Sequence, residues 1–241
     1  MISAARATGD DSLRRLESRA VAAYLGLALG DALGATVEFM TPREIRSAYG
    51  VHAHIRGGGW LKLKCGEVTD DTTMTMALGE AILARGGVEA QAVARAFDAW
   101  MRAKPVDIGN TVRRGLLHFR RTGEAEVPES EHDAGNGACM RCLPVALATL
   151  GEPAETVRRA SRTQAHVTHH NPLSDAATEC VVDMVQRALA GAGLRELLRG
   201  SVQPLVAAHP QFAFRGRRVD NPGGYVADTL RAVFQALFDS D

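Results

Sequence analysis

The chain has 241 residues, of which 46% are hydrophobic and 23% charged, a composition typical of a globular domain with a sizeable core. Its 28 basic and 28 acidic residues cancel, which disfavours a dedicated nucleic-acid-binding protein, because that class needs a basic excess. Four cysteines in a chain of this length do not suggest disulfide staples, so free thiols and a cytoplasmic location are expected.

The N-terminal part is predicted to be a tail followed by a buried helix. Residues 1–17 mix charges with small polar groups and lack the apolar run of a signal peptide, so we expect a loose tail. Residues 20–34 are apolar around nearly the whole helical circumference, which predicts a helix buried on all sides. Gly26, Gly30 and Gly34 would let neighbouring backbones approach it closely. Its most apolar stretch has 11 residues, whereas about 20 are needed to span a bilayer, so no transmembrane segment is expected.

Two carboxylates, Asp31 and Glu38, emerge at the end of this apolar helix. A buried carboxylate must be paired or bound to a cation, so these two are more informative than acids on the surface. The glycine-rich residues 52–68 follow and are predicted to form a loop or a short hairpin.

Five consecutive oxygen-bearing side chains come next and open a predicted helix. They are Thr69, Asp70, Asp71, Thr72 and Thr73. A single residue of this kind suffices as an N-cap, and acids suit that end of the helix dipole. Two adjacent carboxylates exceed this need, and hard cations such as Mg²⁺ and Mn²⁺ prefer oxygen ligands. Both a helix cap and a metal site stay open for this segment.

Two amphipathic helices are predicted next, one over residues 88–103 and one from about Asp107 to Gly123. Pro105 separates them. Their apolar stripes contain Val93, Phe97, Trp100 and Met101 in the first and Ile108, Val112, Leu116 and Phe119 in the second. Asp107 and Asn110 lie three residues apart at the start of the second helix and share a face, either as caps or as ligand contacts.

The acidic segment 129–137 contains glycines that would permit close contact with a ligand, although a plain acidic turn also explains it. His169 and His170 precede a helix and are candidate ligands that lack an obvious third partner. Cys139 and Cys142 form a C-x-x-C pattern inside a helical run. The absence of a second ligand pair disfavours a redox or zinc site there.

Three further helices complete the predicted order. The first covers residues 137–150, the second is capped by Ser174 or Asp175 and ends near Gly191, and the last covers residues 223–238. No alternation of strands and helices and no internal repeat is visible. The sequence therefore predicts a single all-α domain.

Seven runs of the sequence stand in a fixed order and carry most of the residues singled out above. They are residues 26–38 (GLALGDALGATVE), 57–60 (GGGW), 68–72 (VTDDT), 105–110 (PVDIGN), 133–137 (DAGNG), 140–144 (MRCLP) and 171–175 (NPLSD). Together they closely resemble the motifs of ADP-ribosylglycohydrolases, nearest to the dinitrogenase reductase-activating branch. The resemblance covers residues 18–241.

This resemblance implies a compact, orthogonal multi-helix domain around two Mn²⁺ or Mg²⁺ ions. It implies metal ligands at Thr69, Asp70 and Asp71, with Glu38 beside them and Asp107 as catalytic groups. Residues implied to contact the ligand are Asn110, Glu131, Asp133, Gly135, Asn136, Gly137, His169 and Tyr225. The implied reaction is hydrolysis of the N-glycosidic bond between ADP-ribose and a protein arginine, with dinitrogenase reductase as the substrate protein. A PII-type signalling protein is an implied partner.

One motif of the family has no counterpart in this sequence. The family has a late, glycine-rich Asp-x-Asp-Thr motif that supplies further metal ligands, and the terminal Asp239-Ser240-Asp241 lacks the threonine. The resemblance therefore implies that residues 18–241 lack this segment, bind at most one ion tightly and have little or no hydrolase activity. Two alternatives stay open: a non-catalytic regulator that binds ADP-ribose or a metal, and a helical interaction module whose acids are only caps.

Overall fold

The computed structural model describes residues 2–239, with side chains from residue 11 onward. Within these residues the regular structure is helical, and the only β-type contacts are isolated bridges between Gly58 and Leu63 and between Gly135 and Tyr225. The predicted all-α fold is confirmed. The helices, in chain order, are α1 (Ile2–Gly34), α2 (Pro42–Tyr49), α3 (Asp70–Arg85), α4 (Ala90–Arg102), α5 (Asn110–Thr122), α6 (Gly137–Met140), α7 (Leu143–Ala148), α8 (Ala154–Ala165), α9 (Pro172–Ala190), α10 (Leu194–Leu197), α11 (Gln203–Ala208) and α12 (Val226–Phe238). Short 3₁₀ turns at Ala35–Val37 and Pro210–Phe212 and a π-helical turn at Leu198–Val202 join them.

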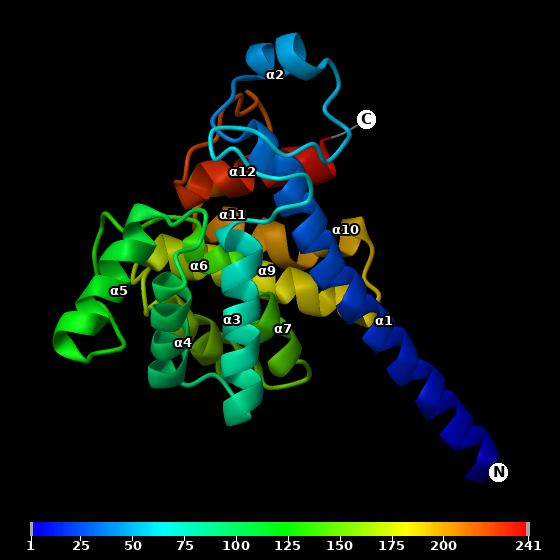
Figure 1. Ribbon diagram of the computed structural model, residues 1–241. Coiled ribbons are helices and arrows are strands. Elements are labelled where there is room, and N and C mark those ends of the chain that lie inside the picture. The colour runs from blue at the N-terminus through cyan, green and yellow to red at the C-terminus, as the bar shows by residue number, and fades with distance from the viewer. Residues whose placement is uncertain (1, 240–241) are drawn as a thin grey trace.

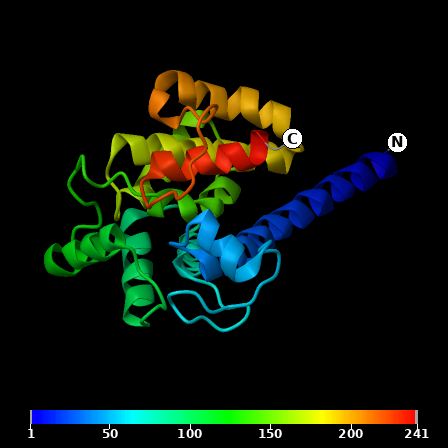
Figure 2. The same ribbon diagram turned by 90° about the horizontal axis from the view of Figure 1, so that it is seen from above.

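Helix α1 is longer and less covered than the sequence predicts. It is continuous from Ile2, so residues 2–17 are helical rather than a loose tail, and its first turns project away from the other helices (Figures 1 and 2). The prediction of burial on all sides is wrong for the described residues, because Val21, Leu25 and Leu29 are each more than half exposed. Apolar residues around a helix show only that it tolerates burial, whereas neighbouring elements decide which side is covered.

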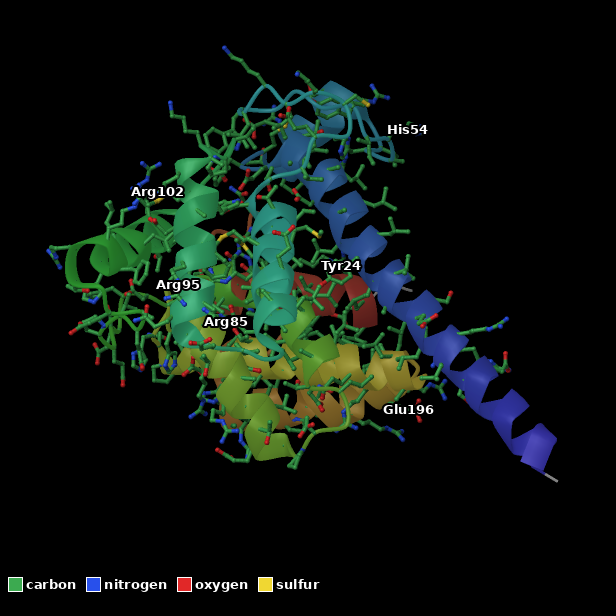
Figure 3. The ribbon with its side chains drawn as sticks, turned by 60° about the horizontal axis from the view of Figure 1, so that its bottom comes forward. Tyr24, His54, Arg85, Arg95, Arg102 and Glu196 are labelled. Carbon is green, nitrogen blue, oxygen red and sulfur yellow. The ribbon has the colours of Figure 1, made fainter. Side chains whose placement is uncertain are left out.

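The three glycines of α1 do not mediate close packing. No described atom outside the helix's own backbone lies within 4 Å of the position that a Cβ would occupy at Gly26, Gly30 or Gly34. The close contact is on α3 instead, where a Cβ at Gly79 would lie 3.2 Å from the hydroxyl of Tyr24. Figure 3 shows Tyr24 between α1 and α3.

The segment Asp11–Val37 is long and apolar enough to cross a membrane by length and composition, which differs from the sequence expectation. This is weak evidence, because a core helix of a soluble protein passes the same test. The segment is also tied to the helical body by polar contacts. Arg19 donates to the carbonyl of Leu189 at 2.7 Å, and Asp31 accepts hydrogen bonds from α3.

The core consists of two apolar clusters that meet at α9. In the first, α3 and α4 lie side by side and pack with α5 and α7 around Met74, Leu78 and Phe97, which are fully buried (Figure 1). The second joins α9, α11 and α12 around Phe212 and Phe234. The apolar stripes predicted for α4 and α5 face the first cluster.

Several helix boundaries differ from the predicted ones. Helix α5 begins at Asn110 rather than at Asp107. Residues 137–150 form two short helices, because α6 ends at Met140 and α7 restarts with Pro144 in its first turn, where proline is tolerated. Helix α9 is capped by Asn171 rather than by Ser174 or Asp175. The Asn171 side chain accepts hydrogen bonds from the Leu173 and Ser174 amides at 2.9 and 3.4 Å.

Helix α2 was not predicted, although its start carries a recognisable signal. The Thr41 hydroxyl accepts from the Glu44 amide, and the Glu44 carboxylate accepts from the Thr41 amide at 2.7 Å, which is a capping box. Pro42 occupies the first helical position. The loop predicted over residues 52–68 is present, with the bridge between Gly58 and Leu63 as its short hairpin.

Candidate active site

The N-terminus of α3 is capped from another helix. Asp31 of α1 accepts hydrogen bonds from the amide and hydroxyl of Thr69, at 2.9 and 2.7 Å, and from the amide and hydroxyl of Thr72, at 3.2 and 2.6 Å. Thr69 itself makes no side-chain cap hydrogen bond. Asp31 therefore caps the amides of Thr69 and Thr72, whereas the carboxylates of Asp70 and Asp71 accept from their own backbone amides.

Asp70, Asp71, Glu38 and Asp107 form an acidic cluster beside this helix end. Burial, followed by repulsion from Asp107 and, more weakly, Glu38, raises the pKa of Asp70 to about 6, although backbone hydrogen bonds oppose the shift. Burial and the charges of Asp70, Asp31 and Glu38 raise the pKa of Asp71 to about 7. Carboxylates this close to one another create a strongly negative site, although the buried guanidinium of Arg141 also interacts with Asp70.

Glu38 is positioned by the glycine-rich loop. Its Oε2 accepts a hydrogen bond from the Trp60 indole at 2.9 Å, and the Trp60 ring packs on Phe39 with centroids 5.3 Å apart. Burial raises the pKa of Glu38, the Trp60 hydrogen bond lowers it, and Asp107 and Asp31 raise it further. Asp107 accepts from the Ile108 amide through Oδ1 at 2.7 Å.

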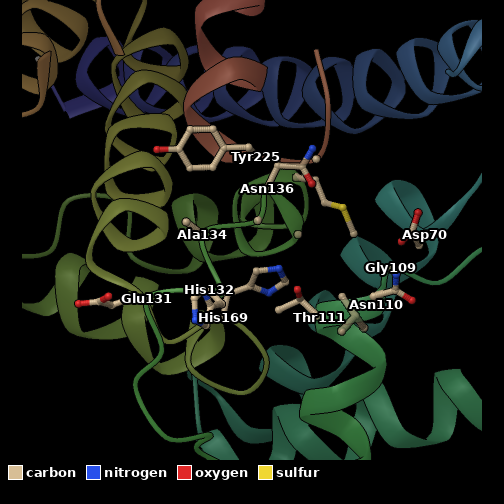
Figure 4. Close-up of a pocket in the computed structure, with 15 residues that line it drawn as sticks. Asp70, Gly109, Asn110, Thr111, Glu131, His132, Ala134, Asn136, His169 and Tyr225 are labelled. Carbon is tan, nitrogen blue, oxygen red and sulfur yellow. The ribbon is translucent and has the colours of Figure 1, made fainter. Parts of the chain in front are cut away.

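A pocket of about 410 Å³ lies next to the cluster and shares Asp70 with it (Figure 4). Most residues predicted to contact a ligand line it, and in this view Asp70 and Glu131 lie at opposite ends. The lining residues that the sequence predicted are Asp70, Asn110, Glu131, Gly135, Asn136, Gly137, His169 and Tyr225. Thr111, His132 and Met140 also line the pocket and were not predicted, although each adjoins a predicted segment.

Tyr225 reaches the pocket because two distant segments pair there. The amide of Asn136 donates to the carbonyl of Gly224 at 2.9 Å, and the amide of Val226 donates to the carbonyl of Ala134 at 2.9 Å. The Asn136 side chain also donates to the Thr229 hydroxyl at 3.2 Å. The start of α12 is thereby held against the 134–136 turn.

The remaining predicted residues lie outside the pocket lining. Thr69, Asp71, Glu38 and Asp107 belong to the acidic cluster or to its capped helix end. Asp133 does not line the pocket and instead forms an ion pair with Arg114. The terminal triplet 239–241, which was not expected to supply ligands, lies outside the described residues apart from Asp239.

His169 is buried in the pocket wall, at 2% exposure. Burial, with the nearby charges of Arg141 and Arg114, lowers the pKa of His169 to about 3, so the imidazole is neutral at physiological pH. A Cβ at Gly137 would lie 2.6 Å from Cε1 of this ring, which only glycine permits. Gly115 allows α5 to approach equally closely, since a Cβ there would lie 2.7 Å from Cα of Thr168.

A separate group of candidate metal ligands lies outside the pocket, at Glu126, His166 and His170. The two imidazole rings stack with centroids 3.7 Å apart and planes 18° apart. A ring nitrogen binds a metal in the plane of its ring, so two nearly parallel stacked rings do not aim at one ion. The C-x-x-C pattern, where the sequence disfavours a redox or zinc site, lies in the interior. Both of its thiols are free and buried, and burial raises the pKa of each.

Comparisons with known proteins agree with this geometry. The family model for ADP-ribosylglycohydrolase matches residues 12–241. An ADP-ribosyl-[dinitrogen reductase] glycohydrolase of Rhodospirillum rubrum is 45% identical over 94% of this chain and 76% of that protein. The ADP-ribosylarginine hydrolase Tri1 of Pseudomonas putida is 32% identical over 92% of this chain, which spans 62% of that protein. A solved structure described as an ADP-ribosylglycohydrolase-related protein complex superimposes with a TM-score of 0.76 at 32% identity, over 92% of this chain and 76% of that one.

The match extends over nearly the whole chain and includes the segments that form the acidic cluster and the pocket. The resemblance indicated by the sequence motifs is therefore confirmed, and with it the assignment to a class of glycohydrolases. The chain belongs to the ADP-ribosylglycohydrolase family.

Proposed function

We propose that this protein hydrolyses the N-glycosidic bond between ADP-ribose and an arginine side chain of a protein, with the help of a divalent cation. The names of the relatives support the bond type, and one of them acts on ADP-ribosylated dinitrogen reductase. The observation that carries the proposal is a pocket of about 410 Å³ that ends on an acidic cluster. A PII-type partner and a cytoplasmic location stay predictions.

The donor set fits a hard cation such as Mn²⁺ or Mg²⁺. Burial raises the pKa values of both Asp70 and Asp71, and repulsion from Asp107 at the first and from Asp70 at the second adds to the shift; a bound cation would offset this repulsion. The Thr69 hydroxyl donates a hydrogen bond to Asp31, which leaves the lone pairs of its oxygen available for a metal. Oxygen donors of this kind suit both ions. Once bound, the cation would act as a Lewis acid on oxygens of the ribose.

The other steps of the reaction are assigned to side chains of the acidic cluster and of the pocket. In the net reaction water adds to the anomeric carbon of the ribose, the bond from this carbon to the arginine nitrogen breaks, and one proton passes to the leaving guanidine. We assign acceptance of the water proton to Asp107, whose carboxylate is held by the Ile108 amide. Glu38 lies close enough to Asp107 for their charges to interact, so it belongs to the same acidic cluster. We assign to Glu38 the stabilisation of positive charge on the sugar in an oxocarbenium-like transition state. Asn110 and Tyr225, both in the pocket lining, would hold the ligand.

The cation site is tested by the substitution Asp70→Asn, which keeps the size of the side chain and removes its charge. We expect manganese affinity, measured by calorimetry, to fall by about tenfold or more, since even residues behind a metal ligand contribute about that much. The control is Glu80→Gln, an equivalent change at an exposed position of the same helix. Equal affinity in Asp70→Asn and the parent would exclude Asp70 as a ligand.

The reaction is tested by release of ADP-ribose from ADP-ribosylated dinitrogenase reductase and from a second ADP-ribosyl-arginine protein. We expect Asp107→Ala to lower turnover by about a hundredfold or more, as is usual for an acid–base group, with an unchanged thermal melt. Binding of ADP-ribose and manganese without turnover by the parent would instead identify a binding protein. Absence of both would leave an interaction module.

A further inference from the structure

Arg141 lies between α6 and α7 and is fully buried. Its Nε and Nη2 donate to Oε1 and the carbonyl of Gln164, at 2.9 and 3.0 Å, and Nη2 also donates to the Thr168 hydroxyl at 2.8 Å. The guanidinium stacks over Phe97, 4.4 Å from the ring centroid. Among the described side chains it forms no ion pair with a carboxylate. Its hydrogen-bond partners are all neutral, although the charge of Asp70 also acts on it. A buried cation held in this way is costly and keeps its partners in one arrangement.

Counting hydrogens along this chain of contacts favours one tautomer of a pocket residue. An arginine has no acceptor atom, so Arg141 must donate and the Thr168 oxygen must accept. Thr168 has one hydroxyl hydrogen, and its only other partner among the described residues is Nδ1 of His169, at 2.8 Å. If the Thr168 oxygen used its second lone pair to accept from Nδ1, its own hydrogen would have no partner among the described residues, so the arrangement that satisfies every hydrogen has the hydroxyl donating to Nδ1. In a neutral imidazole the ring hydrogen then belongs to Nε2.

The protonated nitrogen is the one on the glycine side of the pocket. A Cβ added at Gly135 would lie 2.9 Å from Nε2 of His169, and both residues belong to the pocket lining. Figure 4 places His169 among the pocket side chains. The missing Cβ atoms at Gly135 and Gly137 leave room beside Nε2, and no described atom accepts a hydrogen bond from it.

We propose that Arg141 and Thr168 are positioning residues that fix His169 as a neutral imidazole protonated on Nε2, so that His169 donates one hydrogen bond to an oxygen of the bound ADP-ribose. This rests on the proposed function in its choice of ligand. His169 then has a role in binding rather than in proton transfer. Its Nδ1 accepts the hydrogen bond of the Thr168 hydroxyl and is not available to take a proton from the substrate or from water. Proton transfer is then left to the carboxylates.

Burial and two nearby arginines also favour the neutral form of His169. Burial and the charges of Arg141 and Arg114 keep the pKa of His169 far below its usual value. A second proton on this ring would also have to displace the hydroxyl hydrogen of Thr168 from Nδ1, next to a fixed guanidinium. The same charge that orients Thr168 thus disfavours the imidazolium.

The tautomer is measured directly on the parent protein, without any ligand, by nitrogen NMR of ¹⁵N-histidine-labelled chain. The His169 signals are assigned by their absence in His169→Gln. We expect one protonated nitrogen, Nε2, and one unprotonated nitrogen, Nδ1, with no titration between about pH 5 and 8. A proton on Nδ1, or an imidazolium in that range, would overturn the assignment.

The ligand role is measured by calorimetry with ADP-ribose on Thr168→Val and its matched control Thr168→Ser, which keeps the hydroxyl. We expect binding to weaken about tenfold in Thr168→Val and by less than about twofold in Thr168→Ser, with both variants cooperatively folded in thermal melts. If the substrate is turned over, the loss in Thr168→Val falls on KM, and the pH profile of kcat keeps its shape. Unchanged binding in a folded Thr168→Val, or a shifted kcat profile, would refute the positioning role. If the parent does not bind ADP-ribose, the proposed function and the proposed hydrogen bond from His169 to ADP-ribose are both refuted. The NMR measurement still decides the tautomer of His169.

Discussion

The hydrogen bonds of Asp31 give a stability prediction with a magnitude. Asp31→Ala removes an acceptor from two backbone amides and two hydroxyls at the start of α3, and among the described residues these two amides, of Thr69 and Thr72, have no other hydrogen-bond partner. A hydrogen bond to a charged group contributes about 1.5–3 kcal/mol, and the four are not additive because they share one carboxylate. Treating the shared carboxylate as one charged acceptor and taking the upper value gives a loss of about 3 kcal/mol, above the usual range for a single helix cap.

This loss is measured by urea unfolding of the metal-free chain at about pH 5.5. At that pH Asp71, with a pKa of about 7, is mostly neutral, so relief of its repulsion with Asp31 does not mask the effect. Asp31→Asn, which keeps one accepting oxygen and loses the charge, is expected to fall between Asp31→Ala and the parent. The matched control is Glu17→Ala, an exposed acid on the same helix, expected to change stability by less than about 0.5 kcal/mol. If Asp31→Ala costs no more than Glu17→Ala, the capping of α3 from α1 is refuted.

Three further outcomes follow from the site. In chelator, Asp71→Asn is expected to be more stable than the parent at pH 8. Because burial and neighbouring charges raise the pKa of Asp71 from 3.8 to about 7, the penalty on the folded parent begins above pH 3.8 and is complete above about pH 7, and the difference between the two proteins should vanish below about pH 3, where Asp71 is protonated in both the folded and the unfolded state. Gly137→Ala should displace His169 and abolish ADP-ribose binding. Gly30→Ala, where a Cβ meets nothing, should bind normally and gain up to about 1 kcal/mol in unfolding free energy. In the native protein only Cys65 should react with a thiol reagent, because the other thiols are buried; rapid labelling of a second thiol would contradict the described packing.

Local patterns in the sequence predicted the helices whose signals are contained within them. The apolar stripe with Val93 and Phe97 predicted α4 and its buried face, and Gly123, which has a left-handed conformation, marked the end of α5. Errors occurred where a neighbour decides the outcome. The run through Arg141 looks helical by periodicity, yet the chain breaks there and places the guanidinium against Gln164, a residue more than twenty positions later.

For the site, the sequence determined which chemistry was available, and the tertiary structure determined how it is used. Adjacent carboxylates at Asp70 and Asp71 left both a cation site and a helix cap open, because the sequence shows which oxygen donors are present but not where they point. Whether they cap α3 depended on Asp31, which lies 38 residues before Thr69 and whose hydrogen bonds form only when α1 packs on α3. The protonated nitrogen of His169 likewise depended on Arg141, because a proton on one atom is set by the partners that folding brings within about 3 Å of it. Composition and periodicity act along the chain, whereas hydrogen-bond direction and burial are properties of the packed molecule.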